Sequence, residues 1–404
     1  MYSLFIYLYV FAIKVAALFN GKAREWVNGR KNLLENMKVM QGKNVIWLHS
    51  ASLGEYEQGI PLAQKLKILY PDCKILVTFF SPSGFNHRKN IKEVDYYFYM
   101  PADTISNISK LLNIVNVKFA VFVKYEFWFN AIKTLHDNDV PIYYVACNFR
   151  PDQYFFKWYG KWSRRYLKMV SHFFVQNDVS YNLLRLINVN STVAGDTRFD
   201  RVFAIANSFY EDKIVQNFKG NDKLFVMGSS WEKDEQIVVS TNLITDNYKL
   251  LIAPHLIDVN NISRVKNLFG NDAVLYSGCD ENSVQDFRVL IVDCIGKLSY
   301  LYRYADVAYI GGGFGAGIHN TLEAAAYKIP VIFGPNYKKF NEAVEILKSD
   351  AGFSISNQVQ LNEVIENLLQ NDFYDLIKSN CGSFVKSNIG AVDIITLKIK
   401  ELNS

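Results

Sequence analysis

The stretch ADVAYIGGGFGAGIHNTLEAAAYKIPVIFGP, Ala305–Pro335, decides the fold of the second half of the chain. It reads as a buried strand, a glycine-rich loop, a helix that begins near His319-Asn320, and a second apolar strand that ends at Gly334-Pro335. Two strands joined by a helix in this way form a parallel β-α-β unit. The loop has G-x-G-x-x-G spacing, but no acidic residue ends the second strand as a dinucleotide fingerprint requires. The glycines favour a nucleotide site, and capping by Asn320 with a first-turn Glu323 is the structural alternative.

The same alternation of short apolar strands and helices runs through the chain in two series. The predicted strands of the first series are Asn44–His49, Lys74–Phe79, Tyr96–Met100, Phe119–Lys124, Ile142–Cys147, His172–Val175 and Ser191–Ala194. Those of the second series are Lys223–Met227, Lys249–Ala253, Val289–Asp293, Asp306–Ile310, Val331–Phe333 and Gly352–Ile355. This pattern predicts two facing, doubly wound, Rossmann-like parallel-sheet domains, with ligands at the carboxyl ends of the strands. We place the domains at 22–207 and 208–404, and expect the final helices, near 372–386 and 391–402, to pack back on the first domain.

Charge and cysteine content restrict the class of protein. Residues 1–205 carry 26 Lys and Arg against 15 Asp and Glu, a net +11, and the remainder carries 18 against 24, a net −6. A basic first half favours a nucleic acid or an anionic lipid surface, with uneven surface charge as the simpler alternative. The five cysteines lack C-x-x-C spacing, which indicates reduced, buried thiols and neither a metal site nor a disulfide framework.

The N-terminal segment, Ser3–Phe19, is apolar and rich in aromatic residues, with Lys14 inside it. Its basic flank, from Lys22 to Lys31, follows the apolar run, whereas a cleaved signal peptide carries its positive charge before it. We therefore predict a membrane anchor at 1–21 that leaves the rest of the chain in the cytoplasm. An amphipathic helix that packs on the protein or lies in the membrane interface is the alternative.

The stretch HSASLGEYEQG, His49–Gly59, follows the first apolar strand and leads into a helix. Small residues let a backbone pass close to a ligand, and a helix start offers unpaired N–H groups. Glu55 either caps this helix or takes a proton in a reaction. The residues alone leave both interpretations open.

Three further loops carry polar residues at or near strand ends. In VMGSSWEKDEQ, Val226–Gln236, the hydroxyls could hold a phosphate or simply cap the next helix. VKYEFWFN, Val123–Asn130, places Lys124 and Glu126 after an apolar strand. NFRPDQYFFKWYGKWSRRYLK, Asn148–Lys168, interleaves aromatic and basic residues, which suits a membrane interface, stacking on nucleic-acid bases, or a helix with an aromatic core face.

No motif predicts a metal. Asp137-Asn138-Asp139 has D-x-D spacing, but it lies between a helix and the start of a strand, where Asp and Asn are turn formers. No cluster of His and Cys supports a transition metal, and no Ser-His-Asp arrangement is convincing.

In order along the chain, eight motifs resemble the 3-deoxy-D-manno-octulosonic acid (Kdo) transferases of lipopolysaccharide synthesis. They are H-S-A-S-L-G-E, T-F-F-S-P-S-G, Y-E-F-W, G-D-T-R-F-D, G-S-S-W-E, G-G-G-F, H-N-T-L-E-A-A-A and P-V-I-F-G-P, spread between His49 and Pro335. That family consists of membrane-anchored glycosyltransferases of the GT-B fold. The resemblance covers nearly the whole chain and agrees with the predicted anchor, the two sheets and the basic first half.

The resemblance implies inverting transfer of Kdo from CMP-Kdo to a phosphorylated lipid A precursor such as lipid IVA. It also implies that the enzyme needs no cofactor or metal, binds no nucleic acid and lies on the cytoplasmic face of the inner membrane. Glu55 would be the general base, with Glu126 and Arg198 supporting the transition state. The donor would contact Ser229, Ser230, Pro254, His255, Ile295, Gly296, Lys297, Gly312, His319, Asn320, Thr321, Leu322 and Glu323.

This chain departs from the family pattern at three places. Ala253-Pro254-His255 lacks the arginine of Pro-Arg-His, Ile295-Gly296-Lys297 replaces Met-Gly-Glu, and Lys124 replaces the first Glu of E-x-E. The rival hypotheses are a GT-B enzyme that uses a UDP-sugar, a membrane-tethered dinucleotide-binding oxidoreductase, and a non-catalytic lipid-binding scaffold. The missing acidic ribose residue argues against the dinucleotide hypothesis.

Overall fold

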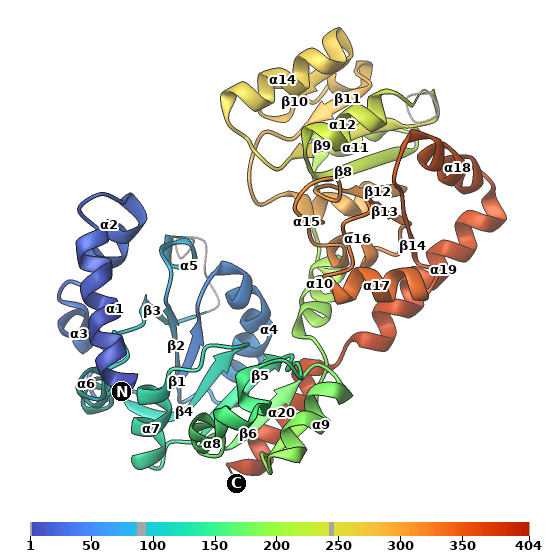
Figure 1. Cartoon of the computed structure of the whole chain (residues 1–404). Coiled ribbons are helices and arrows are strands. Elements are labelled where there is room, and N and C mark those ends of the chain that lie inside the picture. Colours follow the sequence, from blue (N-terminus) through green and yellow to red (C-terminus); the bar gives the residue numbers. More distant parts are fainter. Residues whose placement is uncertain (1, 87–93, 242–245, 404) are drawn as a thin grey trace. The chain divides into compact units, whose positions relative to one another are not determined.

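The computed structural model describes residues 2–86, 94–241 and 246–403, and the chain forms two compact units (Figure 1). The first unit contains Met1–Arg201 and Ile389–Ser404, and the second contains Val202–Asn388. The division falls inside a helix, α10 (Thr197–Asn207), whereas the sequence placed it after residue 207. Each unit holds one seven-stranded sheet in which every strand pair is parallel, so the predicted pair of doubly wound α/β domains is confirmed.

The first sheet has the strand order β3-β2-β1-β4-β5-β6-β7. Its strands are β1 (Asn44–Ser50), β2 (Lys74–Phe79), β3 (Tyr96–Tyr99), β4 (Asn116–Val123), β5 (Ile142–Cys147), β6 (His172–Val175) and β7 (Ser191–Val193). The α-helices are α1 (Tyr2–Ala16), α2 (Gly21–Asn28), α3 (Leu33–Asn36), α4 (Leu53–Leu69), α5 (Pro82–Asn86), α6 (Ile105–Ile114), α7 (Phe129–Asp137), α8 (Lys161–Leu167), α9 (Asp178–Leu186) and α20 (Ala391–Leu402). The 3-10 helices are η1 (Met37–Met40), η3 (Tyr154–Phe156) and η4 (Trp158–Gly160).

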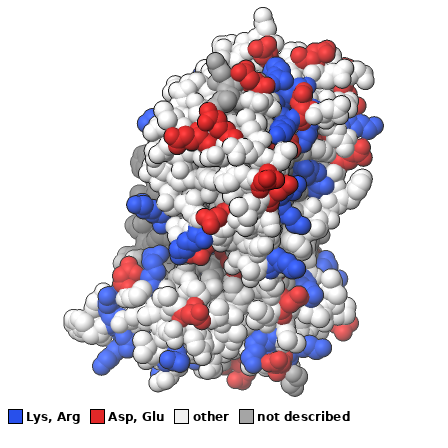
Figure 2. All heavy atoms as spheres, turned by 90° about the vertical axis from the view of Figure 1, so that its right-hand side faces the viewer, with Lys and Arg blue, Asp and Glu red and all other residues white. Residues whose placement is uncertain are grey.

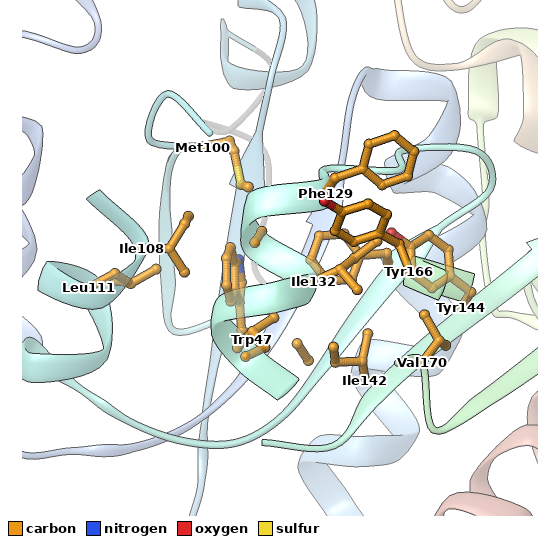
Figure 3. Packing of buried hydrophobic residues seen from close by; sticks show 14 of the residues in the cluster. Trp47, Met100, Ile108, Leu111, Phe129, Ile132, Ile142, Tyr144, Tyr166 and Val170 are labelled. Atoms are coloured by element: carbon orange, nitrogen blue, oxygen red, sulfur yellow. The ribbon is translucent and has the colours of Figure 1, made fainter. Parts of the chain in front are cut away.

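Alternating residues of β1 pack into two separate hydrophobic cores, one on each face of this sheet. Val45 and Trp47 belong to one cluster, and Ile46 and Leu48 belong to the other. Side chains alternate between faces along a strand, so a strand covered on both faces is apolar at every position. Figure 3 shows the Trp47 side of this core, where helix residues such as Phe129 and Ile132 pack above the strands.

The second sheet has the strand order β10-β11-β9-β8-β12-β13-β14. Its strands are β8 (Leu224–Ser230), β9 (Lys249–Pro254), β10 (Ala273–Leu275), β11 (Val289–Ile291), β12 (Val307–Ile310), β13 (Val331–Phe333) and β14 (Gly352–Ser354). The α-helices are α11 (Lys213–Lys219), α12 (Glu232–Val239), α14 (Val259–Phe269), α15 (Leu298–Leu301), α16 (Leu322–Ala325), α17 (Asn341–Lys348), α18 (Gln358–Leu368) and α19 (Asn371–Asn388). The 3-10 helices are η5 (Gly270–Asp272), η6 (Tyr276–Gly278), η7 (Val284–Asp286) and η8 (Tyr302–Tyr304).

The structure differs from the sequence prediction in two elements of the second unit, the edge strand β10 and the helix α19. Strand β10 was not predicted, because three apolar residues at a sheet edge give no clear period. Of the two final helices, only α20 lies on the first unit, where Ile395 and Ile399 join the core beside α4. Helix α19 stays with the second unit, since Cys381 on it is buried and its thiol lies within hydrogen-bonding distance of the Ile329 and Ala351 carbonyls.

The segment predicted as a membrane anchor forms α1, which packs on the first unit. Tyr2 donates a hydrogen bond to Asp103 (2.7 Å), and the Ser3 hydroxyl lies 3.0 Å from the amide oxygen of Asn130. Within the described part of the chain, no helix has both the length and the hydropathy needed to cross a membrane. The spanning form of the predicted anchor is therefore not shown.

The thiols and the surface charge complete the description of the fold. All five cysteines are unpaired, and three of them are buried. On the face that Figure 2 shows, basic and acidic side chains are interspersed and form no single-sign patch. The basic balance of the first half is therefore not concentrated on that face.

Candidate active site

Each unit has one topological switch point, where the chain winds away in opposite directions from two central strands. In the first unit these strands are β1 and β4, and in the second they are β8 and β12. The loops that leave their carboxyl ends diverge, and the crevice between such loops is where open α/β sheets bind ligands. The loop after β1 leads to Glu55, and the loop after β4 contains Glu126.

Glu55 lies in the first turn of α4 and is bound to that helix start. Its carboxylate accepts hydrogen bonds from the Ser52 backbone N–H (2.8 Å) and from the Ser52 hydroxyl. Together with the approach of the Ser52 side chain to the backbone of Glu55, this contact makes a capping box, which stabilises a helix start by satisfying its unpaired donors. The capping interpretation of Glu55 is therefore present in the structure. A capping carboxylate still has lone pairs left for a substrate hydroxyl.

Glu126 lies in a largely buried position, and its carboxyl group is close to Glu55. Burial and, to a smaller extent, the negative charge of Glu55 raise the pKa of Glu126 to about 7, and a side-chain hydrogen bond with Trp128 partly opposes this shift. Carboxyl groups with a pKa near 7 are suited to proton transfer at neutral pH. The two carboxyl groups therefore lie in different environments at one switch point, the arrangement in which acid–base pairs are found.

A buried polar network fixes the side chains around Glu126. The Trp128 indole N–H donates to His49 Nε2 (3.1 Å), and Thr78 Oγ1 lies 2.9 Å from His49 Nδ1. An Nε2 that accepts a hydrogen bond leaves the proton on Nδ1, so His49 is a neutral donor to Thr78. Burial agrees with this assignment, since it lowers the pKa of His49 to about 3. His49 and Trp128 therefore hold the loop that carries Glu126.

Arg198 lies at the start of α10 and is tied to α4 through Asp196. Its guanidinium donates twice to one carboxylate oxygen of Asp196, at 2.7 and 2.9 Å. The other Asp196 oxygen accepts from the Gln58 side chain (3.3 Å), and the Thr197 hydroxyl donates to the Gln58 carbonyl (2.7 Å). The structure therefore connects Arg198 to the helix that carries Glu55.

In the second unit, glycines let the loop after β12 approach two other loops. A Cβ on Gly311 would lie 2.3 Å from the Ser229 carbonyl oxygen, and one on Gly313 would lie 2.5 Å from the backbone nitrogen of Gly334. Asp234 fixes this arrangement, because one of its oxygens accepts from the backbone N–H groups of Gly312 and Trp231, both at 2.9 Å. The glycines are thus required for close packing of backbone on backbone.

Three aromatic rings stack beside this glycine loop. The ring of His255 lies between Trp231, at a centroid distance of 4.7 Å, and His319, at 4.4 Å. The Trp231 indole donates to His319 Nε2 (3.1 Å), and burial together with His255 lowers the pKa of His319 to about 4. The three rings come from the ends of different β-α connections. Trp231 and His319 also line a cavity of about 430 Å³, whose remaining lining residues are Glu232, Lys233, Asp234, Gly312, Phe314, Gly315, Ala316 and Gly317.

Several predicted donor residues lie together at this switch point, but not all are available for a phosphate. Ser230 is buried and its hydroxyl donates to Glu235 (2.8 Å). Ser229 has a positive φ of 53° at a bulge in β8 and is partly exposed. Pro254 ends β9, and the His255 N–H bonds to the Ser230 carbonyl (2.9 Å). The first turn of α12 carries Glu232, Asp234 and Glu235, whose charges oppose a phosphate there.

The loop Ile295-Gly296-Lys297 does not offer a free cation. The Lys297 ammonium pairs with Asp212 (3.1 Å) and lies against Tyr276, and these contacts raise its pKa against the effect of burial. Ile295 is exposed, and Gly296 has a positive φ of 90°. For Lys297 to supply the positive charge of the arginine that is missing beside His255, its ammonium group would have to leave Asp212.

The predicted helix after the glycine loop is a single turn, α16. Asn320 caps it, since its side-chain oxygen accepts from the Leu322 N–H (3.1 Å) and its amide donates to Glu323 (2.9 Å). Thr321 and Leu322 are buried, and Glu323 is partly exposed. These contacts agree with the capping interpretation and leave Glu323 within reach of solvent.

Three residues of the two sites were not predicted from the sequence: His49, Trp128 and Trp231. A histidine at the end of an apolar strand, and tryptophans within loops that follow strands, were the available signals. Among the described residues, no group of three or more His, Cys, Asp or Glu could hold a metal ion. In the D-x-D stretch, Asp137 pairs with Lys133 and Asp139 adopts a positive φ of 56°, as turn residues do.

Solved structures define the fold class. The backbone resembles that of UDP-GlcNAc 2-epimerase from Neisseria meningitidis, with a TM-score of 0.62 and 14% identity. The match covers 89% of this chain and 100% of the epimerase chain. The corresponding enzyme from Methanocaldococcus jannaschii matches over 88% of this chain and 99% of its own, with a TM-score of 0.56 and 16% identity. At such identity the likeness concerns the fold, which is a two-domain α/β fold of the GT-B type.

The sequence comparisons find similarity to Kdo transferases. A model described as 3-deoxy-D-manno-octulosonic-acid transferase (kdotransferase) matches residues 27–201. Kdo transferases from Rickettsia felis and Haemophilus influenzae are 25% and 24% identical over 88% and 84% of this chain, and 79% and 84% of their own lengths. A bifunctional glycosyltransferase/methyltransferase from Fusobacterium nucleatum is 26% identical over 86% of this chain. The match covers only 56% of that longer protein. Over most of its length this chain is therefore similar to Kdo transferases.

Proposed function

We propose that this protein transfers Kdo from CMP-Kdo to a sugar hydroxyl of a phosphorylated lipid A precursor, with inversion at the anomeric carbon. The observation that carries the proposal is the pair of carboxyl groups, Glu55 and Glu126, in the part of this chain that matches the Kdo transferase model. Glu55 and Glu126 interact electrostatically at the switch point of the matched first unit, and burial and Glu55 raise the pKa of Glu126 to about 7. A binding scaffold has no need of such a pair.

In the proposed reaction the acceptor oxygen attacks the anomeric carbon of Kdo while the bond from that carbon to the CMP phosphate oxygen breaks. Glu55 accepts the proton of the acceptor hydroxyl, and CMP leaves with the bonding electrons. Glu126 lies close enough to interact with Glu55, and it stabilises the proton as it is transferred. Arg198, supported by Asp196, supplies positive charge for the leaving phosphate.

The second unit binds the donor in this proposal. The ring stack of Trp231, His255 and His319 offers flat apolar surface and neutral nitrogen atoms, and the glycine loop admits a ligand close to the backbone. Pockets for nucleotides combine apolar walls with a few polar groups in this way. Glu323 is the carboxylate that would bind the ribose hydroxyls. Metal-independent transfer remains part of the proposal.

The test is a transfer assay with detergent-solubilised protein, freshly generated CMP-Kdo and lipid IVA, read by mass spectrometry of the lipid. We expect Kdo on the lipid with the wild type. Unchanged lipid, together with turnover of a UDP-sugar, would contradict the proposal and favour another GT-B activity.

We further propose that the first unit attaches to the cytoplasmic face of the inner membrane. The outer face of α1 exposes Leu4, Leu8 and Phe11, each close to 60% or more. Trp158 is 83% exposed and Trp162 about half exposed, beside the basic side chains of the same segment. Aromatic and basic residues together are typical of membrane interfaces.

The helices that carry these two exposed surfaces, α1 and α8, both pack on the buried Phe129. Its ring contacts Tyr2 of α1 (5.0 Å) and Trp162 of α8 (5.4 Å). Co-sedimentation with vesicles of phosphatidylethanolamine and phosphatidylglycerol should decrease in the Leu8→Ser/Trp158→Ala double variant. Equal sedimentation of the variant and the wild type would contradict this attachment.

A further inference from the structure

A cavity of about 250 Å³ lies between α1 and the loop that carries Glu126. Its lining is Tyr2, Phe5, Ile6, Tyr9, Tyr125, Glu126, Phe127 and Trp128. Four of these residues come from one stripe of α1, at positions i, i+3, i+4 and i+7, which share a helix face. The other four belong to the loop between β4 and α7. The segment predicted as an anchor, with packing on the protein as the alternative, thus forms one wall of a cavity at a candidate catalytic residue.

We propose that this cavity binds the pyranose ring of the acceptor sugar, and that the inner stripe of α1 is a specificity-determining wall of the active site. The inference rests on the proposed function and goes beyond it, since it assigns α1 a role besides membrane attachment. The inner stripe is defined as Tyr2, Phe5, Ile6 and Tyr9. Phe5 of this stripe is 61% exposed, so the cavity is open to solvent there. Leu4, Leu8 and Phe11 do not line the cavity and form the outer face that we propose for membrane attachment.

Helix α1 is held firmly enough to serve as a wall. The Tyr2 hydroxyl donates to Asp103 (2.7 Å), and Asp103 also accepts from the backbone N–H groups of Asn130 (3.2 Å) and Ala131 (2.7 Å). One buried carboxylate therefore joins the start of α1 to the start of α7. Because α7 directly follows the Glu126 loop, the two walls of the cavity share one anchor point.

An aromatic chain connects the middle of α1 to the polar network of the active site. Tyr9 stacks on Phe80 at 6.3 Å, Phe80 packs on Trp128 at 4.9 Å, and Trp128 donates to His49. Tyr9 and Glu126 both line the cavity, and burial raises the pKa of the Tyr9 hydroxyl, with Arg30 opposing this shift and Glu126 adding to it. Tyr9 and Glu126 therefore face the same space from opposite elements.

The chemistry of the lining favours a sugar ring over the other parts of a glycolipid. Aromatic faces pack on the C–H groups of a pyranose, and a carboxyl group at the end of the cavity can bind its hydroxyl groups. An acyl chain would cover the Glu126 carboxyl group with apolar surface and offer it no hydrogen-bond donor, which is unfavourable for the ionised form. A phosphate would meet the like charge of ionised Glu126. The cavity volume suits one ring rather than a disaccharide.

The experiment measures binding of a water-soluble, fully deacylated, phosphorylated glucosamine disaccharide to the full chain by calorimetry. Tyr9→Ala removes the middle of the inner stripe. Tyr7→Ala is the matched control, because Tyr7 lies on the same helix, is 58% exposed and does not line the cavity. A ligand without acyl chains separates the sugar site from membrane attachment, and calorimetry separates binding from turnover. Thermal unfolding of both variants checks the fold, and Tyr9→Phe provides a milder second variant.

We expect Tyr9→Ala to weaken sugar binding at least tenfold, Tyr9→Phe to weaken it less, and Tyr7→Ala to leave it unchanged. Equal affinity of Tyr9→Ala and the wild type would overturn the inference. Lack of sugar binding by a wild type that transfers Kdo to lipid IVA would also overturn it, and would point to acyl-chain recognition in the cavity. A wild type that binds the sugar but transfers no Kdo would contradict the proposed function alone.

Discussion

The two units have the same sheet topology but place different chemistry at their switch points. In the first unit, the loops after β1 and β4 bring together two carboxyl groups, Glu55 and Glu126, over a network of buried hydrogen bonds. In the second unit, the loops after β8 and β12 bring together glycines and a stack of aromatic rings. The fold fixes where a site forms, and the loop residues decide what it does.

The difference also concerns how each site uses its acidic groups. In the first unit, burial raises the pKa of Glu126, so this carboxyl group gains or loses its proton near neutral pH. In the second, Asp234 has backbone and tyrosine donors, and Glu235 pairs with Arg264 at 2.6 Å. Asp234 and Glu235 of the second unit thus hold loops and helices in place, whereas the first unit combines a capping carboxylate, Glu55, with a carboxyl group of raised pKa, Glu126.

The largest effect should follow from removing the proposed base. Glu55→Gln keeps the size of the side chain, and we expect it to lower the Kdo transfer rate by about 10²- to 10⁴-fold, the range for a lost general base. Glu57→Gln is the control, since Glu57 lies on the same helix and pairs with Arg201 at 3.2 Å. The rate is measured by mass spectrometry of the lipid. Equal rates for the two variants would reduce Glu55 to a helix-capping residue.

Gly311→Ala should test the packing of the second unit. The added Cβ has no space beside the Ser229 carbonyl and the Ser230 Cα, both fixed backbone atoms, so we expect a loss of about 3 kcal/mol or more. Gly315→Ala is the matched control in the same loop, because its Cβ would meet only the Gly312 carbonyl, at 3.6 Å. Denaturant unfolding measures both. A tolerated Gly311→Ala would mean that the two loops are not in close contact.

Glu126→Gln should change how stability depends on pH. The folded protein keeps a proton on Glu126 up to about pH 7, whereas an unfolded chain releases it near 4.5. Stability of the wild type therefore falls as pH rises through this window, and the glutamine variant escapes that loss. Relative to the wild type, we expect the free energy of unfolding of the variant to be about 1–3 kcal/mol higher above pH 7 and unchanged below pH 4.5. An equal difference at pH 4 and pH 8 would show that Glu126 is not perturbed.

Trp231→Phe should have the smallest effect of the four. A phenylalanine keeps a ring on His255 but loses the donor to His319, which lies 3.1 Å from the indole nitrogen. The loss of one hydrogen bond is worth about 1 kcal/mol, so CMP affinity should fall a few-fold. Calorimetric titration with CMP measures it. A Trp231→Phe protein with unchanged affinity would exclude this contact from the donor site.

The strands were the most predictable part of the fold. A strand buried on both faces is apolar at every position, and for β2, β5, β6 and β13 the predicted bounds match the observed ones. Very short elements, and contacts between residues far apart in the sequence, were harder to predict. Strand β10 has only three residues, and α16 is a single turn because its helical pattern ends in the following apolar strand. Packing of α19 on the second unit depends on contacts that no local pattern records.

For the site, the sequence located the loops but not the partners of their side chains. Glu55 and Glu126 were found from strand ends and from the family resemblance, yet the buried His49 between Thr78 and Trp128 follows only from the packed structure. In the same way, nothing near Lys297 in the sequence indicates its pairing with Asp212, which lies 85 residues away. Long-range partners decide whether a charged residue is available.

The division of labour between the two units is tested most directly by CMP titration of two variants, one from each switch point. The account predicts that Glu55→Gln binds CMP with wild-type affinity, and that His319→Ala, which loses a ring of the stack, binds it at least tenfold more weakly. Loss of CMP binding by Glu55→Gln, or unchanged binding by His319→Ala, would contradict the assignment of the nucleotide to the second unit.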